Sequence, residues 1–147
     1  MTIIDINKIK NLIPHREPFL FVDSCEILEK GSKGIGHRFF KNDEYFFKGH
    51  FPHMPIVPGV ILIEALAQTA GIIVSNTFDN NTDKSVLFMS VSKAKFRKPV
   101  LPNDMISFHV FCLNKVKSVY KFSGEAFNKD GIKVCESEFT AMITSKD

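Results

Sequence analysis

Residues 57–74 read Val-Pro-Gly-Val-Ile-Leu-Ile-Glu-Ala-Leu-Ala-Gln-Thr-Ala-Gly-Ile-Ile-Val, and Glu64 is the only charged residue among them. No other Asp, Glu, Lys or Arg occurs between Lys48 and Asp79. The length and the Leu and Ala content predict a helix after Pro58, a residue suited to a first helical turn. A helix that is apolar on every side is normally buried, and burial of an unpartnered carboxyl group is strongly unfavourable. Glu64 must therefore have a partner or take part in chemistry.

The composition predicts a single domain, residues 1–147. The chain has 44% hydrophobic residues and shows no repeat, low-complexity tract or linker that would divide it. A net charge of +3 is too small by itself to indicate nucleic-acid binding. Cys25, Cys112 and Cys135 lie far apart and lack metal-type spacing, which favours free thiols.

The location that the sequence predicts is cytoplasmic. The amino terminus lacks the basic and apolar regions of a secretory signal. The apolar run approaches the length of a membrane-spanning helix, but Glu64 and Gln68 argue against that interpretation, so we expect no membrane association.

Several secondary-structure elements can be predicted around this helix. Ile6, Ile9 and Ile13 recur at helical spacing after Asp5, a suitable cap, and Pro14 ends that segment. The elements predicted next are a strand over residues 19–30, a turn over 31–34, a returning strand over 35–40, a polar loop over 79–84, and extended segments to the end with a turn over 128–131.

This layout, α-β-β-α followed by about four strands, predicts an α+β domain in which an antiparallel sheet covers the apolar helix. A single sheet face cannot easily surround such a helix. We therefore expect a second copy of the chain to help enclose it, and predict a homodimer.

Five motifs together resemble the 3-hydroxyacyl-[acyl-carrier-protein] dehydratase family of bacterial-type fatty acid synthesis. They are Pro14-His15-Arg16 with Pro18-Phe19-Leu20, Gly49-His50-Phe51-Pro52, Pro58-Gly59-Val60, Glu64-Ala65-Leu66-Ala67-Gln68 and Phe96-Arg97-Lys98-Pro99-Val100. The resemblance covers nearly the whole chain. It implies the hot-dog fold, a curved antiparallel sheet around a central helix, and an enzyme without cofactor or metal that is a homodimer and assembles as a trimer of dimers.

The reaction implied is loss of water from a 3-hydroxyacyl thioester, carried on acyl carrier protein, to give the trans-2-enoyl thioester. A neutral imidazole at His50 can accept the proton α to the carbonyl. The backbone N–H of Gly59, at the helix start, can stabilise charge on the thioester oxygen. Glu64, if kept protonated by apolar surroundings, can protonate the leaving hydroxyl. In the family, the His and the Glu of one site come from different subunits.

Other residues are predicted to bind the substrate or its carrier. Phe51 and Phe88 are predicted to line an acyl tunnel, and Gln68 to contact substrate. The basic cluster, defined as Lys93, Lys95, Arg97 and Lys98, is predicted to dock the acidic carrier protein. On a regular strand Lys93, Lys95 and Arg97 would share one face, opposite Ala94 and Phe96. The alternative for the basic cluster is an ordinary solvated strand face, and nucleic-acid binding is disfavoured.

Simpler interpretations exist for the two central residues. Glu64 could be a structural carboxyl paired with Gln68, a backbone group or a buried Arg, and His50 could be a loop histidine that fixes a turn. His53 stands where the family commonly has Gly, and it is given no catalytic role. His15, His37 and His109 lack metal-type spacing, so no metal is predicted.

Three rival functions remain open on the sequence. A related dehydratase-isomerase would normally have Asp at the position of Glu64. A hot-dog thioesterase would release free acid from an acyl thioester. A non-enzymatic acyl-binding module would bind thioesters without forming an enoyl product, and would not need His50 and Glu64 together.

Overall fold

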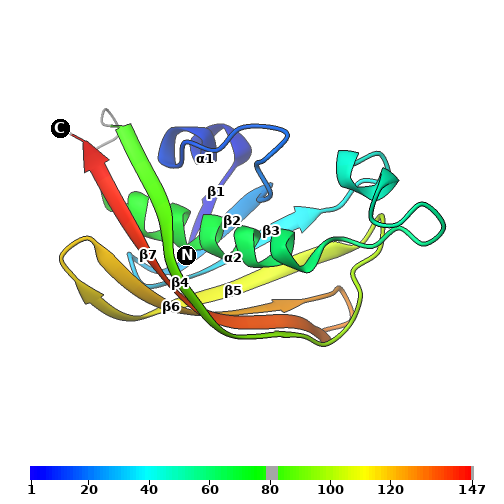
Figure 1. Ribbon diagram of the computed structural model, residues 1–147. Helices are drawn as coiled ribbons and strands as arrows, with labels where there is room; N and C mark the ends of the chain where they lie inside the picture. The colour runs from blue at the N-terminus through cyan, green and yellow to red at the C-terminus, as the bar shows by residue number, and fades with distance from the viewer. Residues whose placement is uncertain (79–82, 147) are drawn as a thin grey trace.

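The computed structural model describes residues 1–78 and 83–146, and shows one antiparallel sheet curled around a long helix (Figure 1). The elements are β1 (Thr2–Ile4), α1 (Ile6–Leu12), β2 (Ser24–Glu29), β3 (Lys33–Phe39), a 3₁₀ helix η1 (Tyr45–Lys48), α2 (Gly59–Ser75), β4 (Asp83–Phe96), β5 (Met105–Val116), β6 (Val119–Phe127) and β7 (Lys133–Lys146). The seven strands follow the order β1-β2-β3-β5-β6-β7-β4. The predicted α+β hot-dog fold is confirmed.

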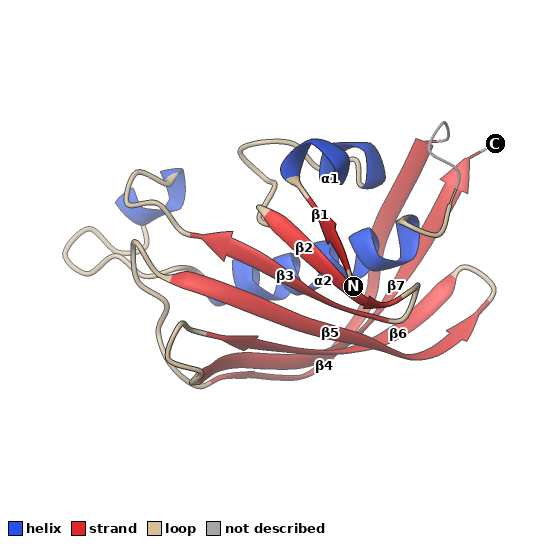
Figure 2. Cartoon of the chain, turned by 180° about the vertical axis from the view of Figure 1, so that it is seen from behind, coloured by secondary structure: helices blue, strands red, loops and turns tan. Residues whose placement is uncertain are grey.

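Helix α2 is enclosed within the single chain. Every residue from Ile61 to Ser75 except Glu64 is buried. Strands β2 to β7 contact the helix, and seen from behind β2 and β3 cross in front of it (Figure 2). Figure 1 shows α1 on the side of α2 that faces away from β5 and β6, where Ile9, Leu12 and Ile13 join the same core. Within one chain the amino-terminal segment covers the side of α2 that the sheet leaves open, and the predicted homodimer stays a prediction.

Helix α1 forms as its sequence predicts. The Asp5 side chain accepts a hydrogen bond from the backbone N–H of Lys8 at 2.9 Å, which caps the first turn. The helix ends at Leu12, ahead of Pro14. The Arg16 guanidinium then donates to the carbonyls of Lys10, Ile13 and His15, at 2.7, 3.0 and 2.6 Å. These bonds satisfy carbonyls at the helix end and fix the turn that follows.

The predicted boundaries differ from the structure at both arms of the first hairpin. Residues 19–23 form no strand, because Leu20, Phe21 and Val22 pack into the core around α2 instead of pairing along the sheet. Strand β3 begins at Lys33, inside the predicted turn, and β1 was not predicted at all. Of the predicted loop at 79–84, residues 79–82 lie outside the described residues, and the last two already belong to β4.

Strand β4 lies at an edge of the sheet and carries exposed apolar side chains. Among the strands that the structure describes, its only neighbour is β7. The register shifts between Ser92 and Lys95, and Lys93 adopts a φ of 52° in the left-handed region. This bulge breaks the regular alternation predicted for Lys93, Lys95 and Arg97. The exposed large apolar residues on this strand are Leu87, Phe88, Met89, Val91 and Phe96.

Candidate active site

The imidazole of His50 has a fixed orientation. His50 follows η1, and its backbone N–H donates to the carbonyl of Phe46 at 3.1 Å. Its ring Nδ1 lies 3.0 Å from the carbonyl oxygen of Ile56. A carbonyl can only accept a hydrogen bond, so in the neutral ring Nδ1 carries the proton and Nε2 holds the free electron pair. The ring is thereby set up to accept a proton at Nε2.

A cavity of about 430 Å³ opens beside His50. It brings together three of the predicted site residues other than His50: Gly59, Arg97 and Lys98. Its remaining lining residues are Ile56, Val57, Val60, Leu62, Phe96, Pro99 and Val100. The walls are mainly apolar, and the polar groups are the imidazole, the start of α2, Arg97 and Lys98, which suits an apolar substrate with one polar, reactive end.

Gly59 is the first residue of α2, and its backbone N–H makes no backbone hydrogen bond within the described ranges. The first N–H groups of a helix lack partners inside the helix and attract negative charge. A methyl group built on Gly59 would come within 2.6 Å of Phe96 Cε1. A side chain at residue 59 would thus displace the Phe96 ring that packs over the helix start, a contact that the sequence did not reveal.

Glu64 is partnered on one carboxyl oxygen. Gln68 Nε2 donates to Glu64 Oε2 at 2.9 Å, and His15 Nε2 lies 3.3 Å from the same oxygen. The side chains of His15 and Glu64 are only 14% and 17% exposed. The pairing with Gln68 weighed as a structural alternative is present. The contact with His15 was missed, although His15 belongs to the Pro14-His15-Arg16 motif.

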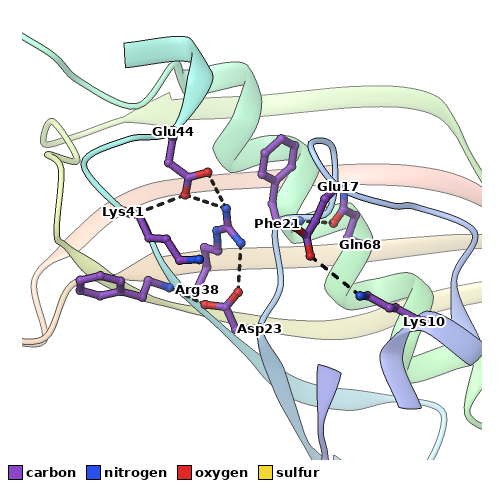
Figure 3. Close-up of polar contacts among 9 residues, drawn as sticks. Lys10, Glu17, Phe21, Asp23, Arg38, Lys41, Glu44 and Gln68 are labelled. Atoms are coloured by element: carbon purple, nitrogen blue, oxygen red, sulfur yellow. Dashed lines mark hydrogen bonds and ion pairs between the residues drawn. The ribbon is translucent and has the colours of Figure 1, made fainter. Parts of the chain in front are cut away.

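Gln68 links Glu64 to the segment before β2. Its side chain is fully buried, with Oε1 accepting from the N–H of Phe21 at 2.8 Å and Nε2 also donating to the carbonyl of Phe19 at 2.9 Å. Figure 3 shows the bond from Phe21 to the Gln68 side chain on the central helix. These protein contacts occupy the amide within one chain, and the predicted contact of Gln68 with substrate stays a prediction.

Within one chain the predicted residues fall into separate places. Glu64 does not line the cavity beside His50, and neither do Phe51 and Phe88. Phe51 stacks on the His50 ring with centroids 4.2 Å apart, whereas Phe88 packs edge-on against Phe139. Phe51 and Phe88 are each 41% exposed. Their role in an acyl tunnel stays a prediction.

Half of the basic cluster is already paired. Arg97 Nε donates to Glu136 at 2.8 Å, and Lys93 lies 3.3 Å from Glu138. The bonds from Arg97 and then Lys133 lower the pKa of Glu136 to about 2, so this carboxylate stays charged at neutral pH. Among residues 1–78 and 83–146, Lys95 and Lys98 form no ion pair.

A second polar cluster supports the segment that leads to His50. Arg38 donates to Asp23 at 3.0 Å and to both carboxylate oxygens of Glu44 at 2.8 and 2.6 Å (Figure 3). Glu44 directly precedes η1, which is followed by Gly49 and His50. The bidentate pair therefore ties β3 to the approach of the His50 loop. No local pattern in the sequence indicated this pairing.

Clusters of metal ligands and membrane-spanning helices are both absent from the described residues. Among them no group of three or more His, Cys, Asp and Glu side chains lies close enough to hold a metal ion. No helix in the same residues combines the length and the apolar character needed to cross a bilayer.

The chain is similar to known proteins over nearly its whole length. A family model described as FabA-like domain matches residues 13–138. The 3-hydroxyacyl-[acyl-carrier-protein] dehydratase FabZ of Caulobacter vibrioides (strain NA1000 / CB15N) is 45% identical over 144 residues, covering 97% of this chain and 89% of that protein. The protein of that name from Paramagnetospirillum magneticum (strain ATCC 700264 / AMB-1) is 44% identical over 142 residues, covering 96% and 88%.

Among solved structures, the dehydratase heterocomplex ApeI:P from Xenorhabdus doucetiae matches with a TM-score of 0.73, covering 91% of this chain and 89% of that chain. At 13% identity this likeness shows the fold alone. The family match and the two relatives, which are 44% and 45% identical to this chain, show the family as well as the fold. This chain therefore belongs to the FabA-like family, among the 3-hydroxyacyl-[acyl-carrier-protein] dehydratases.

Proposed function

We propose that this protein removes water from 3-hydroxyacyl-[acyl-carrier-protein] to give trans-2-enoyl-[acyl-carrier-protein] in fatty acid elongation. The relatives named above support the reaction. The observation that carries the mechanism is the contact of His50 Nδ1 with the Ile56 carbonyl, which leaves Nε2 unprotonated beside an apolar cavity and a helix start.

In the proposed mechanism, His50 Nε2 takes the proton from the α carbon of the thioester. The electron pair left behind moves toward the thioester oxygen, where the N–H of Gly59 stabilises the developing negative charge. The electron pair then returns to form the double bond between the α and β carbons while the bond between the β carbon and its hydroxyl group breaks, and the proton of the Glu64 carboxyl group joins that hydroxyl to form water. After the reaction His50 has gained one proton and Glu64 has lost one, so proton exchange returns the enzyme to its starting state.

The same proposal requires a homodimer. His50 and Glu64 do not share a cavity within one chain, and β4 offers an unpaired edge with exposed apolar residues. Such an edge is suited to pairing with another strand. We infer that β4 meets its copy and that His50 of one chain then works with Glu64 of the other. We also propose a trimer of these dimers, which the family resemblance implies, and a cytoplasmic location, to which the three free thiols are suited.

The test uses 3-hydroxybutyryl and crotonyl thioesters as substrates. The reaction is monitored by the ultraviolet absorbance of the conjugated double bond. His50→Ala and Glu64→Gln should each lower turnover by at least about 100-fold without loss of folding. His53→Ala is the matched control, since His53 is an exposed imidazole in the same loop, and it should keep the parent rate. Release of free acid would favour a thioesterase, binding without turnover would favour an acyl-binding module, and normal rates in both variants would exclude the assigned roles.

A further inference from the structure

The two oxygens of the Glu64 carboxyl group lie in different surroundings. Oε2 receives the Gln68 amide at 2.9 Å and faces His15 Nε2 at 3.3 Å. Oε1 has no hydrogen bond or ion pair with any residue in the described ranges. It is also not among the buried polar atoms left without a partner, so it keeps contact with solvent. The carboxyl group is thus held through one oxygen and open at the other.

His15 reaches Glu64 from a braced turn. Arg16 donates to the carbonyls of His15 and Ile13, which fixes the backbone between α1 and the loop. This turn places an imidazole from the amino-terminal segment against the middle of α2. The ring is largely buried, and no step of the proposed mechanism uses it.

The ring proton of His15 is best placed on Nε2. His15 Nδ1 is buried and has no hydrogen-bond partner. If Nδ1 carried the proton, its N–H group would be buried without an acceptor. That arrangement costs more free energy than a buried Nδ1 lone pair without a donor, combined with a polar contact made by the N–H at Nε2. In the neutral ring the N–H at Nε2 then faces Glu64 Oε2.

We propose that His15 is a positioning residue that, with Gln68, holds Oε2 of Glu64 and thereby presents Oε1 as the oxygen that carries the proton to the leaving hydroxyl. This inference rests on the proposed role of Glu64. Gln68 alone fixes one contact of the carboxyl group, which leaves rotation about that contact free. The second contact, from a different segment of the chain, restricts this rotation and sets the direction of Oε1.

Two variants of similar shape separate the polar contact from packing. Gln and Met both reach about as far as the His ring, but only Gln supplies an N–H group near the Nε2 position. His15→Met should lower kcat about tenfold or more while KM for crotonyl thioester changes little, since His15 acts on the acid and not on substrate binding. His15→Gln should be at least about fivefold faster than His15→Met. Thermal melting and native mass of both variants check folding and assembly.

A double-variant cycle with Glu64→Gln provides the decisive measurement. If His15 acts through Glu64, His15→Met should have almost no further effect on kcat in the Glu64→Gln background. The same fold loss in both backgrounds, or equal kcat for the Gln and Met variants, would overturn the positioning role. Parent activity in Glu64→Gln alone would instead overturn the proposed function, so the two failures are distinguishable.

Discussion

Gly36 of β3 lies so close to Thr69 of α2 that a methyl group built on Gly36 would stand 2.3 Å from Thr69 Oγ1. The Thr69 hydroxyl is itself bonded to the carbonyl of Ala65 at 2.9 Å, so it cannot turn away without losing that bond. The sheet and the central helix therefore meet at a point where only glycine fits.

Gly36→Ala should lower the free energy of unfolding by about 1–3 kcal/mol, because the added methyl group forces the helix and the sheet apart. Urea denaturation followed by circular dichroism measures the change. Gly49→Ala is the matched control, since nothing lies within 4 Å of a methyl group built there, and it should stay within about 0.5 kcal/mol of the parent. Equal stability of the parent and Gly36→Ala would contradict the close approach.

Mixing two inactive variants should restore activity if the reactive groups come from different chains. A dimer of one His50→Ala chain and one Glu64→Gln chain contains one site with both substitutions and one site with neither. Unfolding and refolding the variants together in equal amounts should give up to about one quarter of the parent activity, because half of the dimers are mixed. Each variant refolded alone is the control. No recovery, with mixed dimers confirmed by native mass spectrometry, would place both groups of a site in one chain.

Substitution of the unpaired lysines of the basic cluster, Lys95 and Lys98, should weaken binding of the carrier protein more than binding of the acyl group. Lys95→Glu and Lys98→Glu should each raise KM for an acyl-[acyl-carrier-protein] substrate about tenfold, because a negative charge repels an acidic partner. For Lys95→Glu, which lies outside the cavity beside His50, KM for a small acyl thioester should change little, and the effect on the carrier-linked substrate should shrink in high salt. The control is Lys30→Glu, in the turn between β2 and β3. An equal rise for both substrates would argue against carrier docking.

The buried thiol of Cys25 should make the fold sensitive to alkaline pH. Burial, followed by the nearby charge of Glu26, raises the pKa of Cys25 from 9.0 to about 12. Below pH 9 the thiol is neutral in both states. Between pH 9 and 12 it ionises in the unfolded chain but not in the folded one, so stability falls as pH rises. The melting temperature of Cys25→Ala should fall less steeply from pH 8 to 10.5 than that of the parent. Parallel curves would show that Cys25 contributes nothing.

The elements that the sequence predicted well are those whose signals are local. The cap at Asp5 and the stop at Pro14 define α1, and the apolar run around Glu64 defines α2. Strand β1 was missed because three residues carry no pattern of their own and are stabilised by pairing with β2. Residues 19–22 have the composition of a strand, but Leu20, Phe21 and Val22 pack into the core around α2 instead.

The candidate site was predictable only in part for the same reason. His50, Gly59 and Glu64 stand in recognisable motifs, so their residue types indicated the chemistry. The carbonyl of Ile56 that orients His50, the Phe96 ring over Gly59 and the imidazole of His15 beside Glu64 are contacts made by the folded chain. Nothing in residue spacing specifies such contacts, because they depend on how loops cross α2.

The shared amide of Gln68 has a consequence for attempts to shorten or redesign this protein. One side chain fastens the loop at Phe19 and Phe21 and also holds the carboxyl group of Glu64. Deleting or redesigning the first twenty or so residues to obtain a minimal catalyst would thus misalign the Glu64 carboxyl group and also expose α2 to solvent. The amino-terminal segment and the reactive carboxyl group therefore have to be engineered together.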